Sequence, residues 1–206
     1  MERERTRRMA RPREFDEGKV LDAAVHCFWT RGFDATSVRD LAGSMGITGA
    51  SLYNAFGDKR ALYRRALGHY VHQSVTARIA SCGDMAPRAA LGAFFDEVVT
   101  LSLADTERKG CMLINAAFDV APHDPEFAEV VGAAMRRLED FFADQVERGR
   151  ADGTIGGSLS PRDMGRHLLG ILVGVRVLAR VRPERPLLLG IVQPALAMLD
   201  EGRGGT

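Results

Sequence analysis

The chain has 206 residues, 46% of them hydrophobic, and a formal net charge of +1. This composition is typical of a globular protein with a sizeable core, and it excludes a disordered, collagen-like or disulfide-rich chain. The longest uncharged apolar run near the C-terminus, residues 168–175, is far shorter than the roughly 20 residues of a membrane span. No signal peptide is readable, and three cysteines without metal spacing favour a reducing compartment. We therefore expect a cytoplasmic protein without a membrane partner.

The basic charge is concentrated near the N-terminus. Residues 1–65 carry 13 basic and 9 acidic side chains. Six of the basic ones lie in the first 13 residues: Arg3, Arg5, Arg7, Arg8, Arg11 and Arg13. A basic arm of this kind is a cue for phosphate binding, and a solvated tail is the alternative.

Helical periodicity dominates the chain, and strand patterns are rare. The apolar spacing predicts a first helix over residues 16–31 and a second, short one that begins at Thr36 or Ser37. Ser37 and Asp40 have the spacing of a capping box, in which the two side chains satisfy free backbone N–H groups at the helix start. The second helix is short because glycines follow within one or two turns.

A tight turn at residues 45–47 precedes a third helix, which Thr48 can cap and which runs to about Phe56. Two short helices joined by a turn that contains glycine form a helix-turn-helix. The small residues Gly49 and Ala50 allow the start of the third helix to enter a major groove about 12 Å wide. The pattern therefore predicts a DNA-binding unit.

The remainder of the chain is expected to be helical as well, divided by proline, glycine and capping residues. These helices are expected at about 59–81, 86–103, from 111, at 125–150, 161–181 and 186–201. The predicted fold is all-α.

Four short segments carry a family resemblance. They are residues 36–42 (TSVRDLA), 46–48 (GIT), 51–56 (SLYNAF) and 59–63 (KRALY). In this order and spacing they resemble the TetR family of bacterial transcriptional regulators. Residues 110–115 and 121–125 are also similar to a TetR subgroup with Gly-Cys before the sixth helix.

The resemblance implies an all-helical homodimer that leaves palindromic DNA when a small molecule binds. It implies a helix-turn-helix domain over residues 16–62 and a ligand-binding and dimerisation domain over residues 63–202. Residues 1–15 would be a basic arm and residues 203–206 a tail. The partners expected are double-stranded operator DNA, a second copy of the chain and a small-molecule effector, with no cofactor.

The resemblance also assigns residues to the DNA interface. Those expected to contact phosphates are Thr36, Ser37, Thr48, Tyr53 and Lys59. Those expected to face base edges are Gly49, Ala50 and Asn54, and asparagine can bond adenine through two hydrogen bonds. Core packing is the alternative for Tyr53, and a purely capping role is the alternative for the hydroxyl residues.

Apolar and polar side chains of the later helices are expected to line an effector pocket. The residues expected to touch the ligand are Phe95, Met112, Asn115, Phe118, Phe141 and His167. Plain core packing is the alternative for the apolar ones, and a core or interface histidine is the alternative for His167.

The last two predicted helices are apolar on nearly all sides, which favours burial against a second subunit. The residues expected at this four-helix interface are Leu168, Leu172, Val175, Leu189, Val192 and Leu196. Burial within one subunit is the alternative.

Cys111 opens a predicted helix, and Arg108 and Lys109 stand just before it in the sequence, an arrangement that favours the thiolate. It is a candidate redox or electrophile sensor, and a small buried hydrophobe is the alternative. Cys82 is expected at a solvent-side helix end. His69 and His72 share a helix face but fall short of the four ligands of a usual zinc site, so no metal site is expected.

Three classes of function remain to be compared. No P-loop, dinucleotide fingerprint, HExxH motif or nucleophile elbow is present, so no enzyme activity is expected. The leading hypothesis is a ligand-responsive, sequence-specific DNA-binding regulator, most often a repressor. The alternatives are a thiol sensor acting through Cys111 and a helical interaction module that does not bind DNA.

Overall fold

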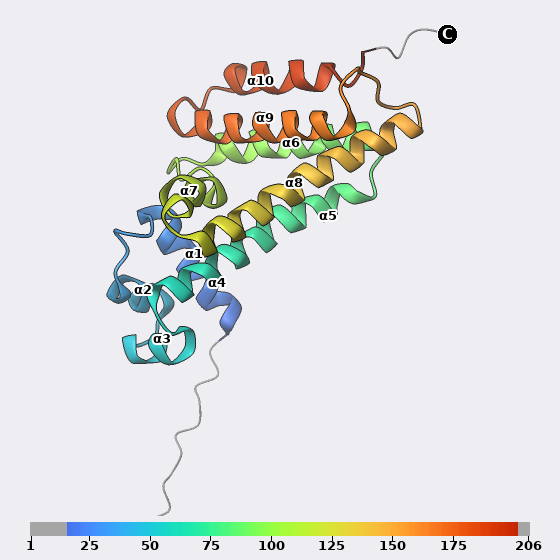
Figure 1. The fold of residues 1–206 in the computed structure, drawn as a ribbon. Helices are drawn as coiled ribbons and strands as arrows, with labels where there is room; N and C mark the ends of the chain where they lie inside the picture. The colour runs from blue at the N-terminus through green and yellow to red at the C-terminus, as the bar shows by residue number, and fades with distance from the viewer. Residues whose placement is uncertain (1–15, 202–206) are drawn as a thin grey trace, which may run out of the picture.

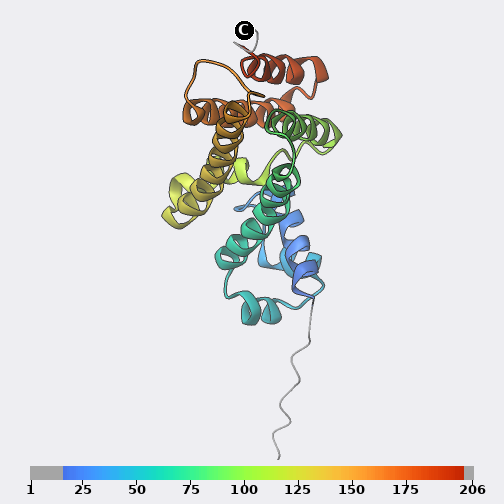
Figure 2. The same ribbon diagram turned by 90° about the vertical axis from the view of Figure 1, so that its right-hand side faces the viewer.

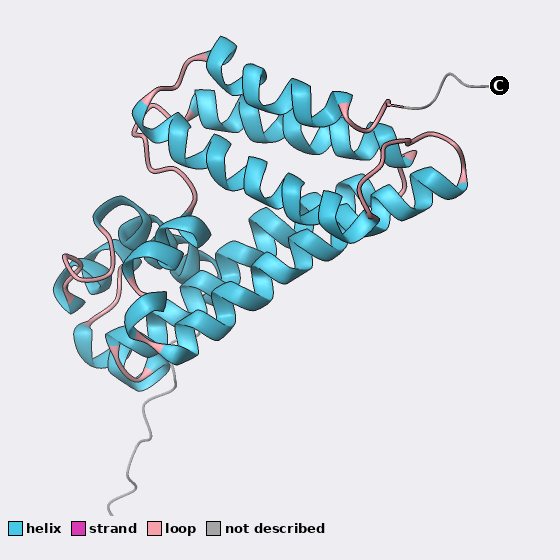
Figure 3. Cartoon of the chain, turned by 45° about the horizontal axis from the view of Figure 1, so that its top comes forward, coloured by secondary structure: helices cyan, strands magenta, loops and turns pink. Residues whose placement is uncertain are grey.

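The structure, a computed structural model, describes residues 16–201 of the chain. This part of the chain is all-α, as the sequence predicts, and the described residues form no strand (Figure 3). The basic arm predicted for residues 1–15 and the tail predicted for residues 203–206 lie outside the described residues. Within the described range, no helix has the length and apolar character needed to cross a bilayer.

Three helices and the start of a fourth form a small cluster at one end of the molecule (Figure 1). They are α1 (Glu17–Arg31), α2 (Val38–Met45), α3 (Gly49–Phe56) and α4 (Lys59–Val71). We call α1, α2, α3 and the first turns of α4 the N-terminal cluster. Its helices bury one shared apolar core because their apolar residues recur at helical spacing.

The helix ends in this cluster are fixed by the side chains that the sequence singles out. Ser37 and Asp40 form the capping box of α2. Thr48 caps α3 by accepting a hydrogen bond from the backbone N–H of Ser51. Gly46 closes α2 with a φ of 67°, a left-handed conformation that glycine adopts without strain. The predicted caps and tight turn are therefore confirmed.

The fourth helix continues beyond the cluster. Helix α4 passes through a π-helical segment, η1 (His72–Thr76), into α5 (Ala77–Gly83). We call these three segments the α4–α5 rod, which runs from the N-terminal cluster into the larger part of the molecule (Figure 1 and Figure 2). The helix predicted for residues 59–81 is thus present, but the sequence pattern did not indicate its π segment. Such segments are frequent at functional sites.

Five helices and a short 3₁₀ turn make up the rest of the described chain. They are α6 (Pro87–Ala104), α7 (Met112–Asp119), η2 (Ala121–His123), α8 (Pro125–Ala151), α9 (Pro161–Val181) and α10 (Arg185–Ala197). Helices α6, α9 and α10 stack in layers at the end of the molecule far from α3, and α8 crosses beneath them (Figure 1). The α7 helix lies between this stack and the N-terminal cluster.

Phenylalanines from α6 and α8 form the centre of the larger core. The ring centroid of Phe94 lies 5.6 Å from that of Phe95, 5.6 Å from that of Phe141 and 5.0 Å from that of Phe142. The sequence-based expectation that Phe95 and Phe141 touch a ligand is corrected here. Both rings are buried among the other aromatic side chains, and neither lines the hollows described below.

Helices α9 and α10 pack on each other and on α6. Four residues that the sequence assigned to a subunit interface are buried within a single chain: Leu168, Leu172, Val175 and Val192. That assignment is wrong for these four residues, because the apolar sides of α9 and α10 face the chain's own core. The alternative, burial within one subunit, describes them.

Candidate DNA-binding surface and effector pocket

The α3 helix lies at the tip of the N-terminal cluster (Figure 1 and Figure 2). It buries Leu52 and Phe56 and leaves Ala50, Tyr53 and Asn54 exposed, with Tyr53 at 52% of its full exposure. The residues at the start of α3 are small, so the backbone there can approach a groove closely. The structure therefore places three of the predicted DNA-contacting residues on one accessible helix.

Thr48 begins this surface. It is exposed, and its hydroxyl oxygen accepts from the Ser51 backbone N–H at 3.1 Å and lies 2.9 Å from the Ser51 hydroxyl. The next residue, Gly49, is half-buried and opens the helix. The unpaired N–H groups of a helix start point outward and favour a phosphate. The start of α3, which carries these donors, therefore lies at the tip of the molecule.

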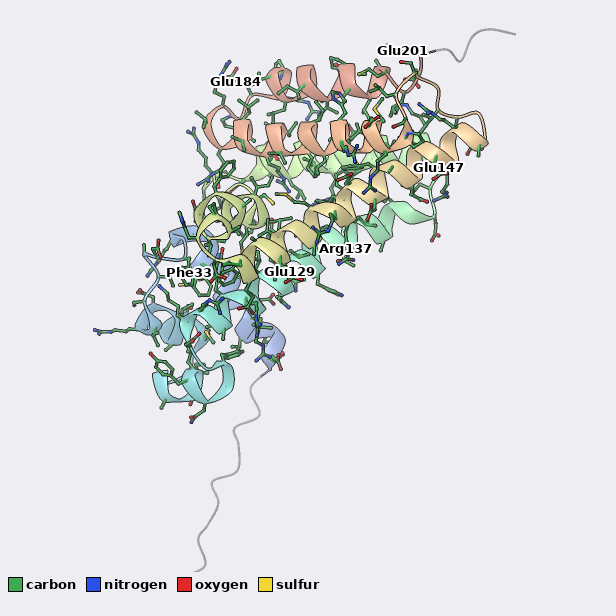
Figure 4. All side chains as sticks on the ribbon, viewed as in Figure 1. Phe33, Glu129, Arg137, Glu147, Glu184 and Glu201 are labelled. Carbon is green, nitrogen blue, oxygen red and sulfur yellow. The ribbon has the colours of Figure 1, made fainter. Side chains whose placement is uncertain are left out.

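Lys59 stands at the first position of α4. Its ammonium donates to the Phe33 carbonyl oxygen at 2.9 Å and lies 4.4 Å from the centre of the Phe33 ring. Phe33, labelled in Figure 4, belongs to the loop between α1 and α2. An ammonium has three donors, so Lys59 can hold this loop and still reach a phosphate. The structure thus gives the predicted phosphate-binding lysine a second, structural contact.

Thr36 differs from the expectation. Its side chain is 1% exposed, and its hydroxyl donates to the Gly32 carbonyl oxygen at 2.6 Å. The prediction that Thr36 contacts phosphate is therefore wrong in this structure, because the hydroxyl is buried and its proton is already used. The next residue, Ser37, forms the cap of α2.

Ser37 is exposed, but its hydroxyl is committed to the capping box. The hydroxyl donates to the Asp40 carboxylate and accepts from the Asp40 backbone N–H at 3.1 Å. Arg31 adds an ion pair to the same carboxylate at 2.7 Å. The hydrogen bonds of Ser37, with the charge of Arg31, lower the pKa of Asp40 to about 2. Asp40 is thus ionised at neutral pH, and a phosphate contact by Ser37 would have to form beside this negative charge.

Sequence reasoning missed Arg39. It is exposed on α2 and forms no ion pair with the residues that the structure describes. The signal was present in the sequence, since Arg39 lies on the polar side of a helix whose apolar residues are Val38, Leu41 and Ala42. A cation without an ion pair in the first turn of a helix is a further candidate for phosphate contact.

A hollow lies between the α4–α5 rod and helices α6 to α9. We call it the inner hollow. Its lining is mainly apolar and includes Val75, Phe94, Leu113, Ile114, Met135, Leu138, Leu169, Leu172 and Val173. Its polar lining residues are Tyr70, Ser74, Arg78, Cys111 and Arg176. A mainly apolar hollow with a few polar groups has the character of a small-molecule site.

A second, more open hollow adjoins the first. We call it the outer hollow. The two hollows share Tyr70, Ser74, Arg78 and Arg176. The inner hollow therefore meets the outer one at these four polar residues, two of which follow or belong to the π segment of the rod.

The other predicted ligand residues lie elsewhere. Met112 and Asn115 line a third hollow next to α1, which Arg180 also lines. Phe118 is 64% exposed on α7, and His167 is exposed on α9. Neither of these two lines the three hollows. None of the six residues predicted to touch the ligand lines the inner hollow. Helical periodicity indicates that a side chain faces inward, but it does not indicate whether space remains beside that side chain.

Cys111 does line the inner hollow. It is half-buried at the start of α7, and the Tyr70 hydroxyl lies 3.5 Å from its Sγ. Burial raises the pKa of Tyr70 well above its usual value, so its phenol stays protonated. Cys82, expected at a solvent-side helix end, is buried instead, and burial raises the pKa of its thiol. The described His, Cys, Asp and Glu residues contain no group of three that could hold a metal ion.

The fold and the exposed α3 helix define a helix-turn-helix transcriptional regulator. Comparison with known families agrees. A family model described as bacterial regulatory proteins of the tetR family matches residues 20–66, and a tetracyclin repressor-like C-terminal domain matches residues 87–187. The chain belongs to the TetR family of bacterial regulatory proteins, and it is a DNA-binding transcriptional regulator.

Relatives and solved structures support this assignment. The uncharacterized HTH-type transcriptional regulator YezE of Bacillus subtilis (strain 168) is 32% identical, covering 93% of this chain and all of YezE. The repressor ComR of Escherichia coli (strain K12) is 29% identical over 68% of this chain and 69% of its own length. The TetR-family regulator CifR, solved as a cysteine mutant with a 26-bp operator duplex, superposes with a TM-score of 0.79. It is 31% identical, covering 91% of this chain and 98% of that chain.

Proposed function

We propose that this chain is a ligand-responsive repressor that binds a palindromic operator as a homodimer and leaves it when a small molecule occupies the inner hollow. The similarity to the repressor ComR and to CifR, which was solved with operator DNA, supports the operator part. A related protein of Mycolicibacterium smegmatis, FasR, is an activator, so repression is part of the proposal. A regulator of this kind acts in the cytoplasm, where bacterial DNA lies.

The α4–α5 rod is the observation that carries the proposal. Its first residues, Lys59 and Arg60, belong to the N-terminal cluster, and its later residues Tyr70, Ser74 and Arg78 line the inner hollow. A ligand that favours one position of this rod therefore also favours one placement of α3. Release of DNA requires that the ligand bind more tightly to that arrangement than to the DNA-bound one.

The first turns of the rod are joined to the start of α8. Arg60 donates to both carboxylate oxygens of Asp124, at 2.7 and 2.9 Å, and pairs with Glu126 at 2.6 Å. The ring of Tyr63 packs edge-on against that of Phe127, with centroids 5.2 Å apart. The boundary that we propose at residues 62 and 63 therefore falls inside a continuous helix, and the two proposed domains are mechanically joined there.

We also propose that Thr48, Tyr53 and Lys59 contact phosphates, and that Gly49, Ala50 and Asn54 face base edges. The exposure of Thr48, Ala50, Tyr53 and Asn54 and the place of α3 at the tip of the molecule support this part of the proposal. Arg39 is added as a phosphate contact, and Thr36 is withdrawn.

For the homodimer we propose an exposed stripe on α9 beside α10. Gly170, Gly174, Val177 and Val181 follow one another at helical spacing, and Val181 is 70% exposed. Leu189 and Leu196 of α10, two of the residues predicted for the interface, are half-buried and can add to it. Small residues between larger apolar ones allow two helices to approach closely.

The experiment that tests the operator part is fluorescence anisotropy with DNA from upstream of the coding region. We expect saturable binding that weakens as salt rises, because phosphate contacts release counterions, and weaker binding to an unrelated duplex. Tyr53→Phe should weaken binding at least about tenfold, since a hydrogen bond to a charged group contributes about 1.5 kcal/mol or more. An absence of affinity even at low salt would favour a helical interaction module that does not bind DNA.

A thiol sensor is the second candidate function, and one observation favours it. Cys111 lines the inner hollow, whereas Cys27 and Cys82 are buried. A maleimide tests it: sulfur bonds to one alkene carbon, and a proton equivalent to the lost thiol proton adds to the other. We expect release of DNA by N-ethylmaleimide in the wild type and none in Cys111→Ser. Release in both proteins would exclude Cys111 as the sensor.

A further inference from the structure

Arg176 is an unusual member of the inner hollow. It is only 9% exposed, and its hydrogen-bond partner is a neutral side chain, the Ser102 hydroxyl, at 3.1 Å. Within residues 16–201 it forms no ion pair. A buried guanidinium without a carboxylate is costly, since desolvation of the charge is not offset by an opposite charge. The position therefore suits a negatively charged group that arrives from outside.

Arg78 is the second cation of the hollow. Its side chain is largely buried, and its Nε lies 3.0 Å from a carboxylate oxygen of Glu97, which is exposed. Its guanidinium also lies 5.6 Å from the centre of the Phe94 ring. Glu97 does not line either hollow. The inner hollow is thus lined by two arginines and by no acidic side chain.

Carboxylates appear only at the outer hollow, and both have partners. Asp105 accepts from the backbone N–H of Gly110 at 2.7 Å, and Glu107 pairs with Lys109. Both carboxylates therefore interact with groups of their own loop, which precedes α7. An anion that enters by the outer hollow therefore meets the two arginines where the hollows join.

We infer that the effector of this regulator is a small amphipathic carboxylate whose charged head binds Arg176 and whose apolar body fills the inner hollow. The inference rests on the proposed function, since it assigns the ligand class of the same pocket. A planar guanidinium matches a carboxylate through two parallel hydrogen bonds. The apolar lining, which includes Phe94, Leu138 and Leu172, suits a short hydrocarbon or aromatic body.

A carboxylate at this place would act on the α4–α5 rod. Arg176 belongs to α9 and Arg78 to α5, the far part of the rod. One anion between the two cations holds these helices together by opposite charge. This gives the ligand the differential affinity for two rod positions that release of DNA requires.

The test measures ligand binding by isothermal titration calorimetry on the full chain without DNA. The probes are hexanoate and benzoate, with hexanamide and benzamide as neutral matches of the same shape. We expect saturable binding of at least one carboxylate and binding of its amide that is at least about tenfold weaker. Arg176→Gln should weaken carboxylate binding at least about tenfold and leave amide binding unchanged. The matched control is Arg166→Gln, an exposed arginine on the same helix that pairs with Glu139 and Asp163.

The inference is overturned if amides bind as tightly as carboxylates, if neither carboxylate binds, or if Arg176→Gln leaves the carboxylate affinity unchanged. Circular dichroism checks that the variant folds. If it does not fold, Ser102→Ala replaces it, because this change frees the guanidinium of its neutral partner. We then expect tighter hexanoate binding at unchanged hexanamide binding, and equal changes for both probes would overturn the inference.

The outcomes separate this inference from the proposed function. Carboxylates that bind through Arg176 but leave operator anisotropy unchanged would support the anion site and contradict effector-driven release. Release of DNA by neutral compounds alone would support the proposed function and overturn the inference that the effector is a carboxylate.

Discussion

Thr36 and Ser37 are adjacent hydroxyl residues with different roles. The Thr36 hydroxyl is buried and bonds the last turn of α1 through Gly32, whereas the Ser37 hydroxyl is exposed and caps α2. Both residues carry the same group, and only their environment distinguishes them. Burial decides which hydroxyl can take part in an interface with DNA.

Thr36→Val tests this difference. It removes one buried hydrogen bond at nearly constant shape, so we expect a loss of about 1 kcal/mol in the free energy of unfolding. DNA affinity, measured by anisotropy well below the melting temperature, should equal that of the wild type. A stable Thr36→Val variant with weaker DNA binding would instead support a phosphate contact by Thr36.

The Asp40 carboxylate makes a specific, pH-dependent contribution to the free energy of unfolding. Its folded-state pKa of about 2 is below the usual value of 3.8, because Ser37 donates hydrogen bonds to it and Arg31 pairs with it. A depressed carboxyl pKa contributes stability that is complete above the unfolded pKa and is lost as the pH falls toward the folded one. We expect this contribution to disappear between about pH 4 and about pH 2. Asp40→Asn should flatten the urea-unfolding stability in this window relative to the wild type, and parallel curves would contradict the assignment.

At the scale of elements, the loop before α7 is held by α9. Arg180 donates to the Arg108 carbonyl oxygen at 3.1 Å and to the Asn115 side-chain oxygen at 3.0 Å. Its aliphatic stem passes over Gly110, where a Cβ atom would lie 2.5 Å from the Arg180 Cδ. Gly110 also has a φ of 73°. The glycine before Cys111 is therefore required by the backbone and by this close approach, independently of any role of the thiol.

Gly110→Ala should consequently destabilise the protein by at least about 1–2 kcal/mol, from the left-handed conformation alone. The matched control is Gly68→Ala in α4, where the added Cβ meets no atom within 4 Å. That substitution should stabilise by about 0.5–1 kcal/mol, since alanine is the better helix former. Chemical denaturation measures both. Equal effects of the two substitutions would contradict the requirement for glycine at position 110.

At the scale of the whole molecule, the distance between two α3 helices decides operator binding. Two recognition helices must reach successive major grooves about 34–36 Å apart, which a single chain cannot do. The proposed stripe on α9 lies at the end of the molecule far from α3, so small rotations there move the tips by larger distances (Figure 1).

Val177→Asp should dissociate the proposed dimer, because it places a charge in an apolar helix contact. Sedimentation should then show a monomer, and operator affinity should fall at least about tenfold since one subunit contacts only one half-site. Phe118→Asp is the matched control, an equally drastic change at a residue that is 64% exposed on α7. A dimer that survives Val177→Asp combined with Val181→Asp would place the interface elsewhere.

Much of the fold could be predicted because its signals are local. Caps such as Ser37 and Thr48 and the turn glycine Gly46 act on backbone groups within four residues, so their spacing in the sequence is also their geometry. The candidate effector pocket could not be predicted in the same way. Periodicity indicated that Phe95 and Phe141 face inward, but both side chains fill the core, and the space lies beside Phe94 and Cys111.

The sequence by itself determined the all-α fold, the helix-turn-helix and the family, since helix ends, apolar spacing and a short motif are written along the chain. Only the tertiary structure decided which buried residue borders a hollow and which is core. It also decided that Thr36 and Leu168 belong to the interior, and that Arg176 is buried without an acidic partner among the described residues. The physical reason is that space and charge balance at one point depend on side chains from several helices, which are far apart in the sequence.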